Sequence, residues 1–312
     1  MNGLKIYVSL FLYMIAFGVH AQVLEAEKTL KAKTDASQEG WMKGASAGLN
    51  LSQTSLVNWA AGGQNSVAVN GFMNVFANYK GNKLAWDNSL NLGYGLLRQE
   101  TYDGYMKTDD KIDFLSKIGR EAFKNFYYAG LLNFKSQMTS GYNYPNDSVR
   151  ISNWLAPAYI VGAIGMDYKP NAYLSAFLAP VTGKVTLVMD DVLSANGAFG
   201  VTAGEKSKQE FGGYVRMIYS KSDFSAEWLK NVSLTTKADF FSNYLKNAKN
   251  VDVNWENIIA MKVNKYISVN FNTHLIYDDD VKFEVANAGG RTRKVSKLQF
   301  KEIFGAGITA KF

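Results

Sequence analysis

The chain has 312 residues and a formal net charge of +7, with 34 Lys and Arg against 27 Asp and Glu. It contains no Cys and only two His, which excludes disulfide bonds, thiolate zinc sites, iron–sulfur clusters and multi-histidine metal centres. We therefore expect no metal and no cofactor. Aromatic residues make up 14% of the chain and 27 Gly outnumber 4 Pro, which is typical of a protein rich in strands with Gly-containing turns.

The first 21 residues have the three-part pattern of a secretory signal peptide. A polar start with Lys5 is followed by an apolar run over residues 6–17, and the segment ends at the small residue Ala21. The run is shorter than the roughly 20 residues of a membrane-spanning helix, so cleavage is favoured over an N-terminal anchor. We expect a signal peptide over 1–21, a periplasmic N-terminal extension over 22–43 and a membrane domain over 44–312.

Apolar and polar residues alternate over segments long enough to cross a membrane as strands. In residues 83–98 one face carries Leu and aromatic side chains, and the other carries Asp87 and Ser89. Residues 67–79 and 266–277 show the same period of two. Strands of soluble proteins run about 5–6 residues, whereas membrane strands run about 9–11. The lengths favour a transmembrane β-barrel with a polar lumen and a lipid-facing exterior.

The alternation predicts an all-β fold, a transmembrane antiparallel β-barrel of about twelve strands. The connections alternate between tight turns, at residues 80–82, 169–171 and 264–265, and longer polar loops. Outer-membrane barrels have this arrangement, with short periplasmic turns and long extracellular loops. The predicted strands start near Gly44, Ser66, Lys83, Asp110, Phe123, Trp154, Ala172, Ala198, Asn231, Val251, Tyr266 and Val295.

Aromatic residues lie at predicted strand ends, where barrels carry interfacial girdles. Trp86 and Tyr168 belong to the periplasmic ends, and Trp255 and Tyr277 to the extracellular ends. The chain stops on an alternating apolar segment that ends at Phe312, which resembles the terminal strand signal read by the barrel-assembly machinery. We expect the protein in the outer membrane of a Gram-negative bacterium, with outer-membrane lipids and this machinery as its partners.

Two motifs and two Gly-containing segments carry a family resemblance. The motifs are Asn-Trp-Ala-Ala-Gly-Gly-Gln-Asn-Ser over residues 58–66 and Ala-Pro-Val-Thr-Gly-Lys-Val-Thr over residues 179–186; the segments are residues 197–200 and 210–214. Together they resemble an uncharacterised outer-membrane family of Bacteroidetes-type bacteria, a domain of unknown function. The resemblance implies a barrel in the outer membrane and transfers no catalytic or binding residue. The motif residues are Asn58, Trp59, Gly62, Gly63, Asn65, Pro180, Thr182, Gly183 and Lys184.

Charges of both signs fall on the predicted lumenal face. They can select solutes at a constriction, or they can pair with one another and close a lumen too narrow for bulk flow. A barrel of about twelve strands lies between filled and open barrels in size, and we favour a narrow or gated lumen. The candidate lumenal residues are Asn70, Asn74, Asp87, Asn91, Asp113, Lys117, Arg216, Lys237, Asp239, Glu256, Asn272 and His274.

Three functions stay open. The first is a narrow or gated channel or binding barrel for small solutes, and the second is a structural or assembly partner in an outer-membrane complex. The third is a lipid-modifying enzyme centred on His274, but Ser268 on the same strand is too far away to pair with it directly. We therefore predict no catalytic residues. The acidic run 278–280 and the basic run 290–294 are interpreted as solvated loops, and nothing indicates nucleic-acid binding.

Overall fold

The structure is a computed structural model that describes residues 39–57, 64–264, 267–286 and 292–311. In these residues twelve strands form one closed antiparallel barrel, in the ring order β1-β16-β13-β12-β11-β10-β9-β8-β5-β4-β3-β2. The predicted all-β barrel fold is confirmed. The barrel strands are β1 (Gly40–Thr54), β2 (Ser66–Gly81), β3 (Leu84–Gln99), β4 (Met106–Phe123), β5 (Phe126–Ser136), β8 (Ala158–Tyr168), β9 (Leu174–Leu187), β10 (Ser207–Lys221), β11 (Val232–Asn243), β12 (Val251–Lys262), β13 (Ile267–Tyr277) and β16 (Gln299–Lys311).

Two predicted strand starts are wrong, and β1 begins at Gly40, before the predicted domain boundary at Gly44. Ala198 starts the short segment η1 (Ala198–Gly200), and the φ angles of 56° at Phe199 and 80° at Gly200 exclude a strand there. The last barrel strand starts at Gln299, because the region around residue 295 forms a separate hairpin. The predicted signal peptide and most of the predicted extension lie outside the described residues.

The two ends of the barrel differ in their connections. The turn end carries short links such as the one between β2 and β3, where Asn82 and Lys83 have φ angles of 45° and 64°. Left-handed residues at both central positions match the right-handed twist of the flanking strands, which keeps this hairpin tight. The loop end carries two small hairpins, β6 (Gly141–Asn143) with β7 (Asn146–Ser152) and β14 (Lys282–Ala286) with β15 (Thr292–Ser296), and the helix α3 (Asp191–Ala195).

The distribution of side chains is the reverse of that in a soluble protein. Phe304 and Ile164 are each 68% exposed, whereas Arg216 and Lys117 are buried. In a single-layer barrel, exposed side chains lie on the outer wall and buried side chains fill the lumen. An apolar exterior around a polar interior is the architecture of a transmembrane barrel. Within the described residues, no helix has the length and apolar character needed to cross a membrane.

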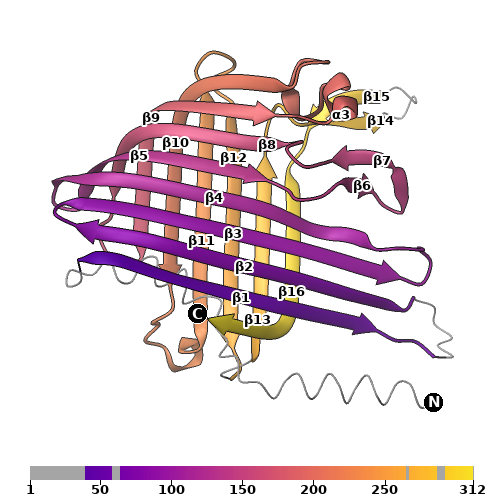
Figure 1. The fold of residues 1–312 in the computed structure, drawn as a ribbon, viewed down its shortest axis with the longest axis horizontal. Coiled ribbons are helices and arrows are strands. Elements are labelled where there is room, and N and C mark those ends of the chain that lie inside the picture. The colour runs from indigo at the N-terminus through magenta and orange to yellow at the C-terminus, as the bar shows by residue number, and fades with distance from the viewer. Residues whose placement is uncertain (1–38, 58–63, 265–266, 287–291, 312) are drawn as a thin grey trace.

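Opposite walls of the barrel cross at a large angle. In Figure 1 the strands β1 to β4 run almost horizontally across the front, while β11, β12, β13 and β16 stand nearly upright behind them. The antiparallel pairings around the ring join these two walls through β5, β8, β9 and β10. Long side chains that point inward from two such walls can meet in the lumen, and the candidate site is built from these contacts.

Candidate functional site

A cluster of apolar side chains fills the lumen between six neighbouring strands, β4, β5, β8, β9, β10 and β11. Phe177 on β9 is 1% exposed, and its ring centroid lies 6.4 Å from that of Tyr214 on β10. Closely packed apolar side chains leave few voids larger than a water molecule. The cluster therefore blocks this side of the lumen with its own residues, which are Leu115, Ala129, Leu131, Ala163, Phe177, Ala179, Tyr214 and Phe241.

Ion pairs connect walls of the barrel that are not neighbours. Nζ of Lys111 on β4 lies 2.7 Å from Oε1 of Glu256 on β12, and these two strands stand opposite each other in the ring. Lys301 on β16 reaches Asp109 on β4 at 2.6 Å. Nζ of Lys135 on β5 lies 3.0 Å from the carboxylate of Asp239 on β11. These side chains cross the lumen within the described barrel.

A second charged network closes the loop end. Lys184 on β9 lies 2.6 Å from Asp252 on β12 and 3.6 Å from both Glu210 and Asp278. Lys208 lies 3.0 Å from Glu210, and it also pairs with Asp280. The acidic run 278–280, which the sequence suggested to be a solvated loop, is therefore partly tied to the lumenal lysines. This network joins two barrel walls with a loop.

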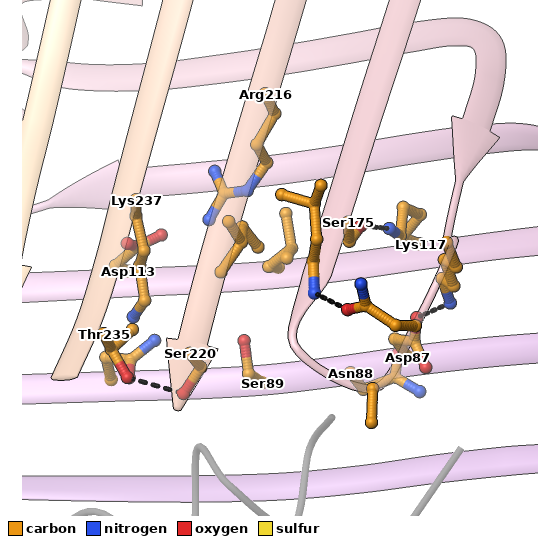
Figure 2. Close-up of a pocket in the computed structure, with 17 residues that line it drawn as sticks. Asp87, Asn88, Ser89, Asp113, Lys117, Ser175, Arg216, Ser220, Thr235 and Lys237 are labelled. Atoms are coloured by element: carbon orange, nitrogen blue, oxygen red, sulfur yellow. Dashed lines mark hydrogen bonds and ion pairs between the residues drawn. The ribbon is translucent and has the colours of Figure 1, made fainter. Parts of the chain in front are cut away.

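A pocket lined by both apolar and polar side chains lies below the apolar cluster, toward the turn end. The pocket has a volume of about 80 Å³. Its walls come from β3, β4, β9, β10, β11 and the turn between β8 and β9. Four basic and two acidic side chains line it, together with neutral polar groups (Figure 2); the residues are Asp87, Asn88, Ser89, Asn91, Asp113, Leu115, Lys117, Lys169, Asn171, Ala172, Leu174, Ser175, Arg216, Ile218, Ser220, Thr235 and Lys237.

The predicted lumenal residues fall into three groups. Six of them line the pocket: Asp87, Asn91, Asp113, Lys117, Arg216 and Lys237. Others belong to the contacts across the lumen, where Glu256 binds Lys111 and Asp239 accepts from Lys135, Tyr214 and Arg216. The remaining four are Asn70, Asn74, Asn272 and His274. Asn70 accepts a hydrogen bond from Thr108, and Asn74 donates one to Asn91. Oδ1 of Asn272 is buried and has no hydrogen-bond partner among the described residues.

The His274 ring is hydrogen-bonded to a side-chain amide of the neighbouring strand. Its Nε2 lies 3.0 Å from Oδ1 of Asn254, its lumenal neighbour on β12. In the described residues, no group of three or more His, Cys, Asp or Glu side chains is placed to hold a metal ion.

Two charged residues at the pocket were not identified from the sequence: Lys169, which lines it, and Asp167, which pairs with the lining residue Lys117. Asp167 near the end of β8 lies 2.5 Å from Nζ of Lys117 and accepts from Ser175 at 2.9 Å. Lys169, in the following turn, donates to Asp87 at 2.9 Å. Both are single charges beside a turn, where a charged residue is ordinary, so no local pattern distinguishes them. Their role depends on which strands the closed ring brings together.

The structure describes only some of the motif residues on which the family resemblance rests. Asn58, Trp59, Gly62 and Gly63 lie outside the described residues. Asn65 accepts a hydrogen bond from the backbone N–H of Leu56 at 2.6 Å and donates one to the carboxylate of Glu100 at 2.9 Å. These bonds tie the β1–β2 connection to the rim of the barrel.

The second motif forms an irregularity in the sheet. Pro180 lies within the register shift between Ala179 and Thr182, and Thr182 is fully buried. A Cβ at Gly183 would meet no atom within 4 Å, and Lys184 enters the loop-end network. Opposite this motif, a Cβ at Gly212 would lie 1.9 Å from the carbonyl oxygen of Ser242, so only glycine fits there.

An ion pair between Asp190 and Arg150, which we call the loop-end latch, joins two elements of the loop end that lie outside the barrel strands. Asp190 caps helix α3 by accepting from the backbone N–H groups of Val192 and Leu193, and it binds Nη1 of Arg150 on hairpin strand β7 at 2.5 Å. Burial alone raises the pKa of Asp190, but the hydrogen bonds from Arg150, Asn153 and Leu193 lower this pKa to about 2. The carboxylate is therefore charged at neutral pH and joins the hairpin to the helix.

Comparisons with known proteins give a family match and a fold. The model of the family described as "Protein of unknown function (DUF3078)" matches residues 51–142. No curated protein sequence matches the chain significantly. The outer membrane channel from Pseudomonas putida F1 shares 10% identity and a TM-score of 0.40, over 90% of this chain and 98% of that chain. The translocator domain of autotransporter NalP from Neisseria meningitidis shares 10% identity and a TM-score of 0.33, over 92% and 95%.

A third structure, OmpT, an outer membrane protein of Vibrio cholerae, shares 9% identity and a TM-score of 0.28, over 89% of this chain and 99% of that chain. The matched family segment, residues 51–142, includes Asn58 to Ser66, the first motif on which the sequence resemblance rested. Over that segment, the chain resembles a protein family of unknown function, as its first motif indicated, whereas the second motif, residues 179–186, lies outside the match.

Proposed function

We propose that the chain is an outer-membrane barrel that binds small polar solutes in its lumen and passes them when the ion pairs across the lumen are released. The observation that carries this proposal is the Lys111–Glu256 ion pair, which joins opposite walls at 2.7 Å. In a water-filled pore, opposite walls are separated by solvent. Here the contact closes the path, while both side chains keep 18–25% of their surface exposed and stay reachable by water.

The pocket supports a role in binding. Pockets that bind small molecules combine an enclosed volume with a few polar groups that fix orientation. This pocket offers lysine and arginine side chains, carboxylates, hydroxyls and amides around one small volume at the turn end. In an outer membrane, the apolar exterior would face lipids, the C-terminal strand would be read by the barrel-assembly machinery, and the turn end would face the periplasm. Phe312 itself lies outside the described residues.

Solute uptake into proteoliposomes tests this proposal. We expect the wild-type barrel to admit small sugars and amino acids slowly. We expect the Lys111→Met/Glu256→Met double variant to admit them faster, because the variant loses the ionic contact and keeps side chains of similar length. Arg98→Lys, at an exposed position of β3 near the loop end, is the matched control. Equal, negligible uptake by all three folded barrels would contradict a gated path.

Such an outcome would favour the second function, a structural or assembly partner in an envelope complex. The partner would then use the loop-end hairpins and the outer rim. Catalysis is not part of the proposal, because no observation favours it: the described contact of the His274 ring is with Asn254.

A further inference from the structure

We infer that the turn-end pocket recognises the oxyanion group of its ligand, a carboxylate or a phosphate, and that Arg216 is the residue that binds it. This inference rests on the proposed binding function and names its ligand class. The pocket reaches the surface at the turn between β8 and β9, where the lining residue Asn171 is exposed. A ligand therefore enters from the turn end, and its passage does not depend on the ion pairs higher in the lumen.

Charged side chains of both signs line the pocket. Lys117, Lys169, Arg216 and Lys237 supply four positive charges, whereas two carboxylates line the same volume. Both carboxylates are engaged with other groups: that of Asp87 accepts from Lys169 at 2.9 Å, and residue 113 accepts from the Asn133 amide at 2.7 Å. Asp167 and Asp239, which pair with Lys117 and Arg216, bring the carboxylates at the pocket to four, so the preference for an anion rests on the hydrogen-bonding edge of Arg216 and not on net charge.

Arg216 has an unused hydrogen-bonding edge in this lining. Its side-chain hydrogen bonds to described residues all use Nη1, which lies 2.9 and 3.2 Å from the two carboxylate oxygens of Asp239 and 3.3 Å from the hydroxyl of Tyr214. Nε is buried and has no partner in the described part of the chain. The side chain is 6% exposed, so bulk solvent does not generally satisfy this group. A buried charged donor without an acceptor is unfavourable, and a ligand that accepts from it removes that penalty.

The geometry of a guanidinium explains why an oxyanion suits this edge. Arginine presents its donors in a planar fork, and one side of the fork can bind two oxygens of a carboxylate or phosphate at once. Asp239 occupies Nη1 and holds the plane in position, which leaves the Nε side for a ligand. Lys237, two residues further toward the turn end on the neighbouring strand, is paired in register with Ile218 and lines the same pocket (Figure 2).

Equilibrium binding to the full-length barrel in detergent tests the inference. The probes are inorganic phosphate, succinate and chloride, measured by titration calorimetry at low ionic strength. We expect phosphate, succinate or both to bind, and chloride to bind much more weakly because it cannot bridge two donors. Arg216→Lys keeps the charge and loses the fork, so its affinity is expected to fall by about tenfold or more. Arg98→Lys is expected to bind as the wild type does.

A second variant protects the test against misfolding. Lys237→Gln leaves the Arg216–Asp239 pair intact and is expected to weaken oxyanion binding as well. Heat-dependent migration on a denaturing gel checks that each variant forms a closed barrel. Wild-type protein that binds neither phosphate nor succinate at millimolar concentration overturns the inference. Wild-type affinity in both Arg216→Lys and Lys237→Gln overturns it as well. Because binding is measured without transport, failure here together with faster uptake by Lys111→Met/Glu256→Met leaves the gated path intact and removes the ligand class alone.

Discussion

Lys111 and Glu256 form an ion pair between the two strands that stand opposite each other in the barrel, with 2.7 Å between Nζ and Oε1. The pair belongs to a set of contacts across the lumen that includes Lys301 with Asp109 and Lys135 with Asp239. In the gated path that we propose, polar contacts hold the lumen closed, and such contacts exchange with water more readily than packed apolar groups do. Closure by charge and closure by packing therefore predict different responses to substitution.

Removing one partner of the ion pair destabilises the barrel. In Lys111→Met the carboxylate of Glu256 stays in the lumen without its cation, and its desolvation is no longer offset. Because both side chains keep part of their surface exposed, we expect a loss of about 1–3 kcal/mol in the free energy of unfolding by urea. Lys111→Met/Glu256→Met is expected to recover part of this loss. Equal stability of wild type and the single variant would show that the pair contributes nothing measurable.

The apolar cluster stabilises the barrel more than any single ion pair. Phe177 is 1% exposed and packs against Tyr214. Truncation in Phe177→Ala leaves a cavity next to the pocket and is expected to cost about 3–5 kcal/mol in unfolding free energy. Urea unfolding followed by tryptophan fluorescence measures this loss. Leu178→Ala, a neighbouring position that is 60% exposed on the outer wall, is the control and should cost less.

The loop-end latch depends on pH through Asp190. Its pKa in the folded protein is about 2, below the unfolded value of about 3.9. A carboxyl whose folded pKa is lowered adds stability that is present above the unfolded pKa and is lost as pH falls through the folded pKa. The hairpin of β6 and β7 should therefore stay attached at neutral pH and detach between about pH 4 and pH 2.

The variant Asp190→Asn tests the latch at neutral pH. It removes the charge that holds Arg150, so trypsin should cleave after Arg150 faster in the variant than in the wild type. Asp191→Asn, at an exposed neighbouring position, should leave the cleavage rate unchanged. An unchanged rate in Asp190→Asn would mean that other contacts hold the hairpin.

The barrel closes through a short seam between its first and last strands. Five residue pairs join β1 to β16, from Ser46–Lys311 to Asn50–Gly307, whereas the other neighbouring strands share ten pairs or more in the described residues. Figure 1 shows β16 upright beside β13, with a bend before its final residues run along β1. Beyond Asn50 the two strands diverge toward the loop end.

Disulfide trapping measures this divergence, because the natural chain contains no Cys. Leu49→Cys/Ile308→Cys places thiols on partner residues within the seam and should oxidise readily. Gln53→Cys/Phe304→Cys would be partners only if the same register continued, and it should stay reduced. Efficient oxidation of the second pair would show that the seam extends to the loop end.

Sequence periodicity was sufficient to predict the barrel because each strand carries its own lumenal and lipid-facing positions. Asp87, Lys117 and Arg216 follow that alternation, and all three line the pocket. The prediction of a strand start at Ala198 was wrong for a local reason. Phe199 takes a left-handed conformation, which is rare for phenylalanine and could not be predicted from its residue type. The pairs of Lys111 with Glu256 and Lys117 with Asp167 depend on which walls face each other. That relation comes from ring closure and the crossing of opposite walls, which alternation along one strand does not contain.

Single-channel conductance in planar bilayers tests closure by charge most directly. Wild-type protein, Lys111→Met/Glu256→Met and Arg98→Lys would be recorded at the same salt and voltage, after folding of each barrel is verified by its heat-dependent gel migration and its insertion by co-flotation with lipid vesicles. We predict rare, small openings for the wild type and for Arg98→Lys, and frequent or larger openings when the ion pair across the lumen is removed. A double variant that is as silent as the wild type would contradict a lumen gated by Lys111 and Glu256.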